Sequence, residues 1–500
     1  MASTHTTETY LAFDLGAESG RAFLGSLRDG KLDIREIHRF ANEPVEYGGT
    51  LPTMHWDAPR IWFEIRKALA TIDAHDTPKL AGMGVDTWGV DYALLGQRGE
   101  LLQNPFHYRD PRNVTAFDDV LARVSRTDIY KATGIQLMVI NTLYQLYAAQ
   151  RDTPKILAAA DKMIMMPDLF HYWMTGNAVC EYTDASTTQF MNPMTRRWAT
   201  DLLDLLGLPS GLPAEIVEPG TVVGHLLPGV SRNASLNGTP VIAPGSHDTA
   251  SAVAAITARG NAAFISSGTW SLIGTELPAP ILSEEAMRFN FTNEGGVCGT
   301  TRLLKNVMGL WMLQCCRRAW LAAGHEYDYA QLTDEAPKAA AFRSIVNPDS
   351  GLFLSPSDMP AAIDEFCRKT DQPCPDSPGA YTRAILESLA LKYRVILRDM
   401  ASVTGDPTEQ IRVIGGGSKS RLLNQFTADA SGKKVLAGPT EAAVLGNIGV
   451  QMLATGSAAS LEEMRAIVER SFPVDVYEPR DPEAWYRAAV RFEQYAATGV

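Results

Sequence analysis

Two segments with the same pattern, about half the chain apart, constrain the fold more than any other feature of the sequence. In each, an apolar run of β-forming residues leads into a tight turn of Gly, Ser or Thr, and a second apolar run follows. The segments are Tyr10-Leu-Ala-Phe-Asp-Leu-Gly-Ala-Glu-Ser-Gly-Arg21 and Ala263-Phe-Ile-Ser-Ser-Gly-Thr-Trp-Ser271. Each pattern predicts a β-hairpin, and the repeat predicts two halves that are built alike.

Both turns have the composition of an anion-binding loop. Glycine lets the backbone approach a ligand closely, and turn N–H groups with Ser or Thr hydroxyls offer several donors to anionic oxygens. Two such hairpins would hold one polyphosphate from both sides. Asp14 ends the first apolar run directly before the turn, where its carboxylate would reach Mg2+ directly or through water. Taken one at a time, each turn is equally consistent with an ordinary loop.

Length and charge limit the classes of protein to consider. The chain of 500 residues, 45% hydrophobic and 20% charged, exceeds the size at which a single core keeps growing. We therefore expect two domains, residues 8–248 and 249–490, with the boundary at the strand-turn-helix pattern Pro240-Val-Ile-Ala-Pro-Gly-Ser-His-Asp-Thr249. The net charge of -12 disfavours nucleic acid or an anionic membrane surface as a partner.

The cysteines and the N-terminus indicate a reducing compartment. The six cysteines show neither a dense framework nor paired CxxC spacing, so we expect reduced thiols in the core. Residues 1–9 lack the charged and apolar regions of a secretory signal, and no apolar span is long enough to cross a bilayer. These observations favour a soluble cytoplasmic protein without a membrane partner.

Residue periodicity predicts an alternation of helices and strands. We expect a helix over residues 58–72, strands within 80–95, mainly helices over 114–176 and a small-residue helix over 250–256. Residues 411–452 read as strand, glycine turn, helix, strand and helix. In the last of these helices, Gly446 and Gly449 would let a neighbouring element approach closely. The whole order favours an α/β fold.

Asp248 is the strongest candidate for chemistry outside the hairpins. It lies at a strand-to-helix turn beside His247 and Thr249, where a carboxylate would point from the C-terminal edge of a sheet into a cleft. A general base suits that place. The alternative is an N-cap, because Asp before a helix often accepts a backbone N–H. His247 has a similar alternative as a structural hydrogen-bond partner.

Three further segments each allow two interpretations. The glycine turn at 415–417 leaves room for a flat ring or a phosphate beside a helix N-terminus, but a triple glycine is also a common loop. Trp88 and Tyr92 beside Gly89 suit the wall of a sugar pocket or ordinary aromatic packing. Residues 107–112 suit polyol binding or a structural ion-pair network. The sequence contains no Walker-type phosphate loop, HExxH or GxSxG motif.

Short segments spread in order over nearly the whole chain carry a family resemblance. In the first part they are Asp14-Leu-Gly-Ala-Glu-Ser-Gly-Arg21, Gly84-Val-Asp-Thr-Trp-Gly-Val-Asp91, Gly134-Ile-Gln136, Asn141-Thr-Leu-Tyr-Gln-Leu146 and Met166-Pro-Asp168. In the rest they are Glu181-Tyr-Thr-Asp-Ala-Ser-Thr-Thr-Gln189, Ser246-His-Asp-Thr-Ala-Ser-Ala-Val253, Ser266-Ser-Gly-Thr-Trp-Ser-Leu272, Thr292-Asn-Glu-Gly-Gly296, Leu304-Lys-Asn-Val-Met-Gly-Leu-Trp311 and Gly438-Pro-Thr-Glu-Ala. Together these segments resemble the FGGY carbohydrate kinases of the actin-like ATPase superfamily.

The resemblance implies an α/β fold and a set of site residues. Two duplicated actin-like ATPase (ribonuclease H-like) domains would flank a catalytic cleft, with the sugar-binding domain first and the nucleotide-binding domain second. Asp248 looks like the acceptor of the sugar hydroxyl proton. The residues that look like the lining of the sugar site are Gly89, His247, Asp248, Thr249 and Asn306. Those that look like ATP contacts are Ala17, Glu18, Ser19, Gly20, Arg21, Thr269, Gln314 and Gly416, with Asp14 as a partner of Mg2+.

Within the family, the segments are most similar to those of kinases that act on L-rhamnulose. This implies ATP- and Mg2+-dependent phosphorylation of the C1 hydroxyl in L-rhamnose catabolism. Two departures stand out: Glu18 replaces a small hydroxyl residue common in sugar kinases, and Asn141 and Tyr144 replace a Lys and Trp signature of the broader family. The second departure argues against a glycerol kinase or a xylulokinase.

Three alternatives stay open at this point. The chain would phosphorylate another ketose, such as L-fuculose or a ketopentose, if a few pocket contacts differ. An actin- or chaperone-like ATPase would share the paired hairpins without a sugar pocket. A sugar-responsive binding protein would keep the fold without catalysis. The sequence leaves the oligomeric state open.

Overall fold

The computed structural model describes residues 7–48, 51–72, 79–257, 261–354, 356–497 and 499. Of the N-terminal stretch discussed above, residues 1–6 lie outside the described residues. The chain forms two compact units, and each unit is made of three segments that alternate along the sequence. The first contains Met1–Thr257, Glu276–Leu303 and Ala442–Phe472, and the second contains Ala258–Thr275, Leu304–Glu441 and Pro473–Val500. The domain boundary between residues 248 and 249 stays a prediction, because compact units defined by packing need not be continuous in the sequence.

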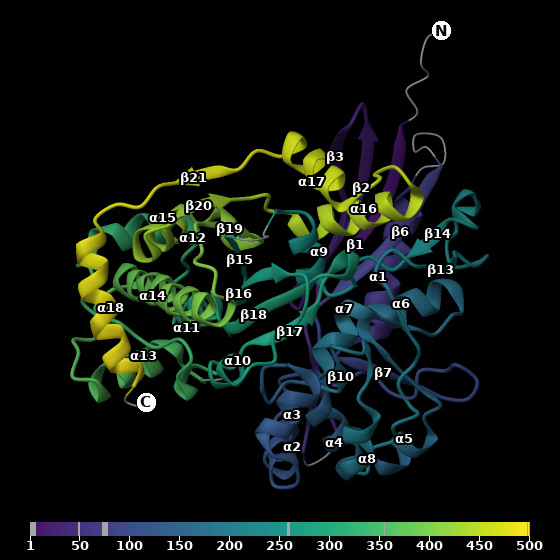
Figure 1. Ribbon diagram of the computed structural model, residues 1–500, viewed down its shortest axis with the longest axis horizontal. Helices are drawn as coiled ribbons and strands as arrows, with labels where there is room; N and C mark the ends of the chain where they lie inside the picture. Colours follow the sequence, from purple (N-terminus) through teal and green to yellow (C-terminus); the bar gives the residue numbers. More distant parts are fainter. Residues whose placement is uncertain are drawn as a thin grey trace. The chain divides into compact units, whose positions relative to one another are not determined.

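A six-stranded sheet forms the centre of the first unit. Its strands are β1 (Glu8–Leu15), β2 (Ser19–Arg28), β3 (Lys31–Ala41), β6 (Leu80–Thr87), β13 (Val222–His225) and β14 (Pro240–Ile242), in the order β13-β14-β6-β1-β2-β3 (Figure 1). The antiparallel pairing of β1 with β2 confirms the first predicted hairpin. Because β6 runs parallel to β1 with Asp14 opposite Asp86, the two carboxyls are carried on adjacent strand ends.

The two faces of this sheet differ because side chains alternate along each strand. Leu11, Phe13 and Leu15 of β1 belong to an apolar core that also contains side chains of α1 (Ala58–Thr71) and α6 (Met166–Thr175). The helix predicted over residues 58–72 is thereby confirmed. Asp57 caps it by accepting from the backbone N–H of Arg60.

Glycines on the opposite face admit a helix from the C-terminal part of the chain. A Cβ at Gly25 would lie 2.5 Å from Ile448 Cδ1, and a Cβ at Gly84 would lie 2.9 Å from Asn447 Oδ1. Both neighbours belong to α16 (Ala442–Thr455), which packs on β1 and β6, and α17 (Leu461–Ser471) packs on β3. Figure 1 shows these yellow helices beside the purple strands of the sheet.

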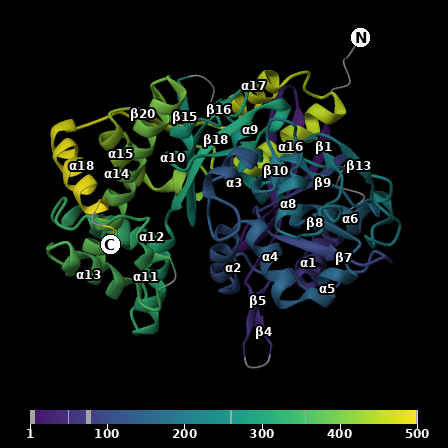
Figure 2. The same cartoon turned by 60° about the horizontal axis from the view of Figure 1, so that its bottom comes forward.

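The rest of the first unit is mainly helical, as expected for residues 114–176, and has its own apolar core. Its helices are α2 (Arg112–Leu121), α3 (Arg126–Thr133), α4 (Thr142–Asp152), α5 (Pro154–Ala159), α7 (Tyr182–Ala185), α8 (Thr200–Leu205), α9 (Asp248–Ala254) and α10 (Glu284–Arg288). Its short strands are β4 (Val45–Tyr47), β5 (Thr53–His55), β7 (Tyr92–Leu95), β8 (Lys162–Met165), β9 (Cys180–Glu181), β10 (Met191–Asn192), β11 (Arg197–Trp198), β12 (Ile216–Val217) and β17 (Thr292–Gly295). The antiparallel pair of β4 and β5 projects from the edge of this unit (Figure 2).

The second unit contains the second predicted hairpin. β15 (Ala262–Ser267) and β16 (Trp270–Leu277) pair antiparallel, which confirms it. In this unit they lie in a sheet in the order β18-β16-β15-β19-β20-β21. Its other members are β18 (Thr301–Met308, of which residues 301–303 belong to the first unit), β19 (Gln410–Ile414), β20 (Lys434–Ala437) and β21 (Asp475–Tyr477). The helices of this unit are α11 (Trp311–Ala322), α12 (Tyr329–Glu335), α13 (Met359–Lys369), α14 (Pro378–Thr404), α15 (Arg421–Ser431) and α18 (Pro482–Ala496). The βαβα order expected after residue 411 is β19, α15, β20 and α16.

The cysteines follow the expectation in part. All six thiols are free, and Cys180, Cys315, Cys316 and Cys367 are buried. Cys298 is exposed, so the expectation of a core thiol was wrong at that position, which lies within a short turn after β17. Among the described residues, no helix combines the length and apolar character needed to cross a membrane.

Gly446 gives a prediction about stability, because α9 crosses α16 at this residue. A Cβ at Gly446 would lie 1.7 Å from the backbone oxygen of Ser251, whereas a Cβ at Gly449 would meet the flexible end of Met464 at 2.6 Å. We expect Gly446→Ala to destabilise the fold by about 3 kcal/mol, because one backbone must move away from the other.

Gly449→Ala is the matched control on the same helix. Both substitutions gain the same helix propensity, about 1 kcal/mol, and only Gly446 meets a backbone atom. The midpoints of urea unfolding compare the two variants with the native chain. Equal midpoints for the two variants would contradict the packing argument.

Candidate active site

Hydrogen bonds from a neighbouring segment fix the loop that leads into α9. Thr87 at the end of β6 donates its N–H to the Ser246 oxygen at 2.9 Å. The N–H of Ser246 donates to Glu181 Oε2, and the N–H of His247 donates to Thr183 Oγ1, each at 3.1 Å. The loop is therefore held by β6 on one side and by the start of α7 on the other.

Asp248 is the first helical residue of α9, and the N-cap alternative is not observed. The N-cap is His247, and its side chain makes no capping hydrogen bond. The Asp248 carboxylate instead accepts from Thr249 Oγ1 at 3.0 Å, and the side chain is 32% exposed. Burial raises the pKa of Asp248, His247 opposes this rise, and the Asp14 carboxylate adds to it. A carboxylate with a raised pKa that is partly open to solvent suits a general base.

His247 connects Asp248 to two buried charged residues. Its Nε2 lies 3.5 Å from Asp248 Oδ1. Its Nδ1 lies 3.1 Å from Arg302 Nη2 and 3.4 Å from Glu294 Oε2. Arg302 and Glu294 also pair with each other at 3.2 Å. Neither residue was predicted from the sequence to have a role. Glu294 lies in the segment Thr292–Gly296 that carries part of the family resemblance, and Arg302 lies in a strand pattern that contains no functional motif.

Asp86 is a third residue that was not predicted from the sequence, although it lies in the segment Gly84–Asp91 that carries part of the family resemblance. It is fully buried and accepts from Asn447 Nδ2 at 2.6 Å. Burial raises the pKa of Asp86 well above its usual range, and the carboxylates of Asp14 and Asp248 raise it further. Three carboxyls from β1, β6 and α9 therefore influence one another within the first unit.

The carboxyls fit a magnesium ion that is held mainly by phosphate oxygens. Mg2+ usually takes one or two carboxylates and keeps waters and substrate phosphates as its other ligands. Asp14 and Asp86 offer such oxygens on adjacent strands, and Arg21 donates to Asp14 Oδ2. Within the described ranges, no group of three or more His, Cys, Asp or Glu residues is arranged to hold a metal ion. The donor set thus suits a Mg2+ partner rather than a closed protein cage.

The first hairpin turn is ordered by its own backbone and by Asn42. The N–H of Gly16 donates to the Ser19 oxygen at 3.0 Å, and the N–H of Asn42 donates to the Glu18 oxygen at 3.0 Å. The Glu18 side chain is exposed, while Ala17, Ser19 and Arg21 are partly buried. A Cβ at Gly20 would lie 2.1 Å from the ring of Phe40. A side chain at this position would displace the Phe40 ring, so the glycine also serves the packing of β2 on β3.

Gly89 lies at a tight contact on the proposed sugar side. A Cβ there would lie 3.1 Å from Thr187 Oγ1, which accepts the N–H of Val90 at 2.9 Å. Trp88 is buried against Trp56, with ring centroids 4.0 Å apart. The indole N–H groups of both tryptophans donate to Asp91 Oδ2, at 2.5 Å from Trp56 and 2.9 Å from Trp88. Trp88 thus has the packing role that the sequence left open.

Residues 107–112 take part in a structural hydrogen-bond network. Asp110 accepts from the N–H of Met54 at 2.7 Å and from the N–H of Arg112 at 3.0 Å. The Arg112 guanidinium lies 3.2 Å from the centroid of the Phe106 ring. Burial lowers the pKa of His107 to about 3, so its ring is neutral.

The second unit brings together three of the proposed ATP contacts around its hairpin turn. Gln314 Nε2 donates to Thr269 Oγ1 at 3.3 Å. The glycine turn packs on β15, because a Cβ at Gly417 would lie 2.0 Å from Ser267 Oγ. Gly416 itself has no described neighbour within 4 Å of a Cβ. Asn306, from the proposed sugar contacts, lies on β18 in the second unit, whereas Gly89, His247, Asp248 and Thr249 belong to the first.

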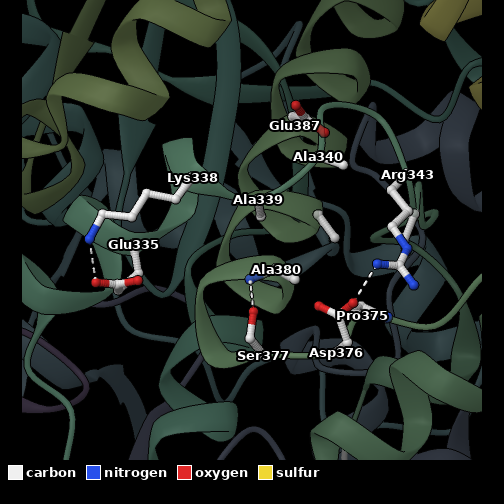
Figure 3. A pocket seen from close by; sticks show the side chains of 12 residues that line it. Glu335, Lys338, Ala339, Ala340, Arg343, Pro375, Asp376, Ser377, Ala380 and Glu387 are labelled. Carbon is white, nitrogen blue, oxygen red and sulfur yellow. Dashed lines mark hydrogen bonds and ion pairs between the residues drawn. The ribbon is translucent and has the colours of Figure 1, made fainter.

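Two cavities elsewhere contain none of the site residues named from the sequence. One of about 300 Å³ lies beside the start of α14 in the second unit (Figure 3). Its cations are paired: Lys338 lies 2.6 Å from Glu335, and Arg343 pairs with Asp376. The other, of about 580 Å³, lies near Tyr172 in the first unit. Paired charges leave the first cavity without an evident ligand.

Comparison with known proteins identifies relatives along the whole chain. A model of the FGGY family of carbohydrate kinases, N-terminal domain, matches residues 9–255, and a model of its C-terminal domain matches residues 263–455. A rhamnulokinase from Bacteroides thetaiotaomicron is 45% identical over 487 residues, which cover 97% of this chain and 99% of that protein. A rhamnulokinase from Enterococcus faecalis is 40% identical, and the match covers 94% of each chain.

Solved structures agree on the fold. A ligand-bound xylulose kinase from Lactobacillus acidophilus has a TM-score of 0.79 at 17% identity, with coverage of 98% of this chain and 97% of that chain. Plasmodium falciparum glycerol kinase with ADP has a TM-score of 0.78 at 14% identity, with coverage of 99% and 98%. The two-domain α/β fold expected from the sequence is therefore confirmed.

The buried Glu181 carboxyl beside the loop predicts a pH dependence of stability. Burial raises the pKa of Glu181 from 4.5 to about 8. Between these values the folded chain keeps a proton that the unfolded chain releases, so stability falls as pH rises, by up to about 1.4 kcal/mol per pH unit. We expect a lower melting temperature at pH 8.5 than at pH 6, and a smaller difference in Glu181→Gln.

The exposed Glu215 of the same unit supplies the control. Glu215→Gln should keep the native dependence of melting temperature on pH. A native protein that becomes more stable from pH 6 to pH 8.5, or a Glu181→Gln variant with the native slope, would be inconsistent with a protonated Glu181.

Proposed function

Because the chain belongs to the FGGY family of carbohydrate kinases, we propose that it transfers the γ-phosphoryl group of ATP to the C1 hydroxyl of L-rhamnulose. The products are L-rhamnulose 1-phosphate and ADP, and the reaction serves L-rhamnose catabolism. The observation that carries the proposal is full-length similarity to rhamnulokinases, at 38–45% identity in seven relatives. The xylulose and glycerol kinases support the fold alone.

Asp248 is the proposed general base. As the C1 hydroxyl oxygen attacks the γ-phosphorus, its O–H bond breaks and Asp248 takes the proton, while the bond from phosphorus to the β,γ-bridging oxygen breaks and ADP leaves. The raised pKa of Asp248 strengthens it as a base. The helix position supports the assignment, because the carboxylate is not used to cap α9.

The remaining site residues would bind and orient the two substrates. Gly89, His247, Thr249 and Asn306 are the proposed contacts of the sugar. Ala17, Glu18, Ser19, Gly20 and Arg21 would meet ATP on the first hairpin, and Thr269, Gln314 and Gly416 would meet it from the second unit. The bond between Gln314 and Thr269 supports a common role for those two residues.

Phosphoryl transfer also needs positive charge near the phosphates. When bound, Mg2+ neutralises charge on the β- and γ-phosphate oxygens. Asp14 is the residue we assign as its partner, through water, with Asp86 behind it on β6. Turn N–H groups of both hairpins would donate to the remaining phosphate oxygens.

Replacement of the proposed base tests the mechanism. Asp248→Asn keeps the size of the side chain but does not accept a proton at neutral pH. We expect kcat to fall by about 100- to 10,000-fold, because a positioned base contributes that much, while the KM for ATP changes little. An ADP-release assay with L-rhamnulose measures both constants.

The control is Asp201→Asn, which makes the same change in the first turn of α8 at an exposed residue. This variant should turn over like the native enzyme. Near-native turnover by Asp248→Asn would exclude Asp248 as the base.

A panel of sugars tests the substrate. We expect ADP release to be fastest with L-rhamnulose, slower with L-fuculose and ketopentoses, and low without sugar. Phosphorus NMR of the product should place the phosphate on C1. A faster reaction with another ketose would reassign the substrate, and rapid ADP release without sugar would favour an ATPase.

A further inference from the structure

Arg302 is a fully buried cation beside the proposed active site. Its side chain has no exposed surface. Its Nε donates to the Gly295 oxygen at 2.8 Å, and its Nη2 lies 3.2 Å from Glu294 Oε2. The third contact is to His247 Nδ1, which lies 3.1 Å from Nη2. Burial of a guanidinium is costly, so these partners fix its position closely.

Neighbouring segments hold β17, which carries Glu294. The N–H of Gly295 donates to Ser186 Oγ at 2.7 Å. A Cβ at Gly295 would lie 2.4 Å from the Tyr182 ring, so β17 lies directly against α7. The same segment holds the loop before Asp248 through Glu181 and Thr183. The segment around α7 therefore holds both β17, to which Arg302 donates, and the loop that carries His247. These contacts set the position of Arg302 relative to His247.

The contact between Arg302 and His247 determines where the imidazole proton lies. A guanidinium has only donors, so the nitrogen that faces it must offer a lone pair. Nδ1 is closer to Arg302 Nη2, at 3.1 Å, than to Glu294 Oε2, at 3.4 Å. A proton on Nδ1 would point its hydrogen at an N–H of Arg302. A neutral ring must then carry its proton on Nε2, the nitrogen that lies 3.5 Å from Asp248 Oδ1.

We propose that Arg302 is a positioning residue that fixes His247 as the Nε2–H tautomer, so that the ring presents a donor toward Asp248. The inference rests on the proposed function, in which Asp248 is the base. A donor on that side holds one carboxylate oxygen in place and leaves the other to the sugar hydroxyl. The opposite tautomer would present a lone pair to the carboxylate and repel it. Glu294 balances the charge of Arg302 without taking the proton of His247.

The tautomer is measurable in the native enzyme without substrate. Nitrogen-15 NMR of a histidine-labelled chain separates protonated from unprotonated ring nitrogens, and the difference from His247→Asn identifies the signals of His247. We expect a lone pair on Nδ1 and a proton on Nε2. A native ring with its proton on Nδ1, where Glu294 would accept it, overturns the proposal.

Variants of Arg302 test the consequence for turnover. Arg302→Met should lower kcat by about 10- to 100-fold, by analogy with partners that orient metal-binding histidines, with little change in the KM for ATP. It should also mix the two tautomers. Arg302→Lys should restore the native tautomer and most of kcat, because an ammonium is likewise a donor only. A purely structural role would leave the tautomer of His247 unchanged in both variants.

A double variant distinguishes an action through His247 from a general loss. In the His247→Ala background, Arg302→Met should reduce kcat by less than 3-fold, since the residue on which it acts is gone. A full second loss overturns the positioning role. If Arg302→Met does not fold, the native tautomer and the Arg302→Lys variant still decide the question.

Failure of the proposed function gives a different result. Absence of turnover with every ketose would refute the kinase assignment, while the ring nitrogens of the native chain would remain readable. Active turnover combined with a protonated Nδ1 would refute the role of Arg302 alone.

Discussion

The close approach of α16 to the first sheet and to α9 is the contact on which the arrangement of the site depends. It is possible only because Gly25, Gly84 and Gly446 carry no side chain where the helix meets its neighbours. The N-terminus of α9 carries Asp248, so the crossing at Gly446 fixes the proposed base relative to the sheet. The next residue, Asn447, donates to Asp86. One helix from the C-terminal part of the chain thus orients two of the three carboxyls.

Burial of carboxyls around the site has a cost that hydrogen bonds offset in part. Glu181 Oε2 accepts from Thr183 Oγ1 at 2.6 Å and from the N–H groups of Asp184 and Ser246 at 3.2 Å and 3.1 Å. Burial nevertheless raises the pKa of Glu181 and Asp184. These hydrogen bonds hold the loop before Asp248 in the folded chain. Preorganisation of this kind is a large contribution to enzymatic rate enhancement.

The sequence predicted the local structure well because the signals for it are local. Both hairpins, the helix after residue 58 and the βαβα order after residue 411 follow from periodicity and turn residues within a few positions. Gly20 was noted for close approach to a ligand, and the structure adds the ring of Phe40 as a reason. Cys298 was expected in the core because six scattered cysteines give no position-specific signal.

Periodicity and turn residues do not predict contacts between segments that are distant in the sequence. The places of Asp14 and Asp248 at the ends of strand patterns singled them out, and the family resemblance added their roles toward Mg2+ and the sugar. Asp86, Glu294 and Arg302 received no role, because a charged residue in a strand is usually exposed and the sequence does not show what neutralises it. Only the folded chain brings the Arg302 guanidinium to His247 and Glu294.

The same contacts act on the pKa of the proposed base, Asp248. A general base is most effective when its pKa lies near the working pH, and the pKa of Asp248 is raised in that direction by burial and by Asp14. His247 opposes them from 3.5 Å away, and in the proposed arrangement the ring nitrogen that faces Asp248, Nε2, carries the proton. By the proposed contact, Arg302 fixes the proton of His247 on that nitrogen. A residue with no exposed surface thus acts through His247 on the proposed base.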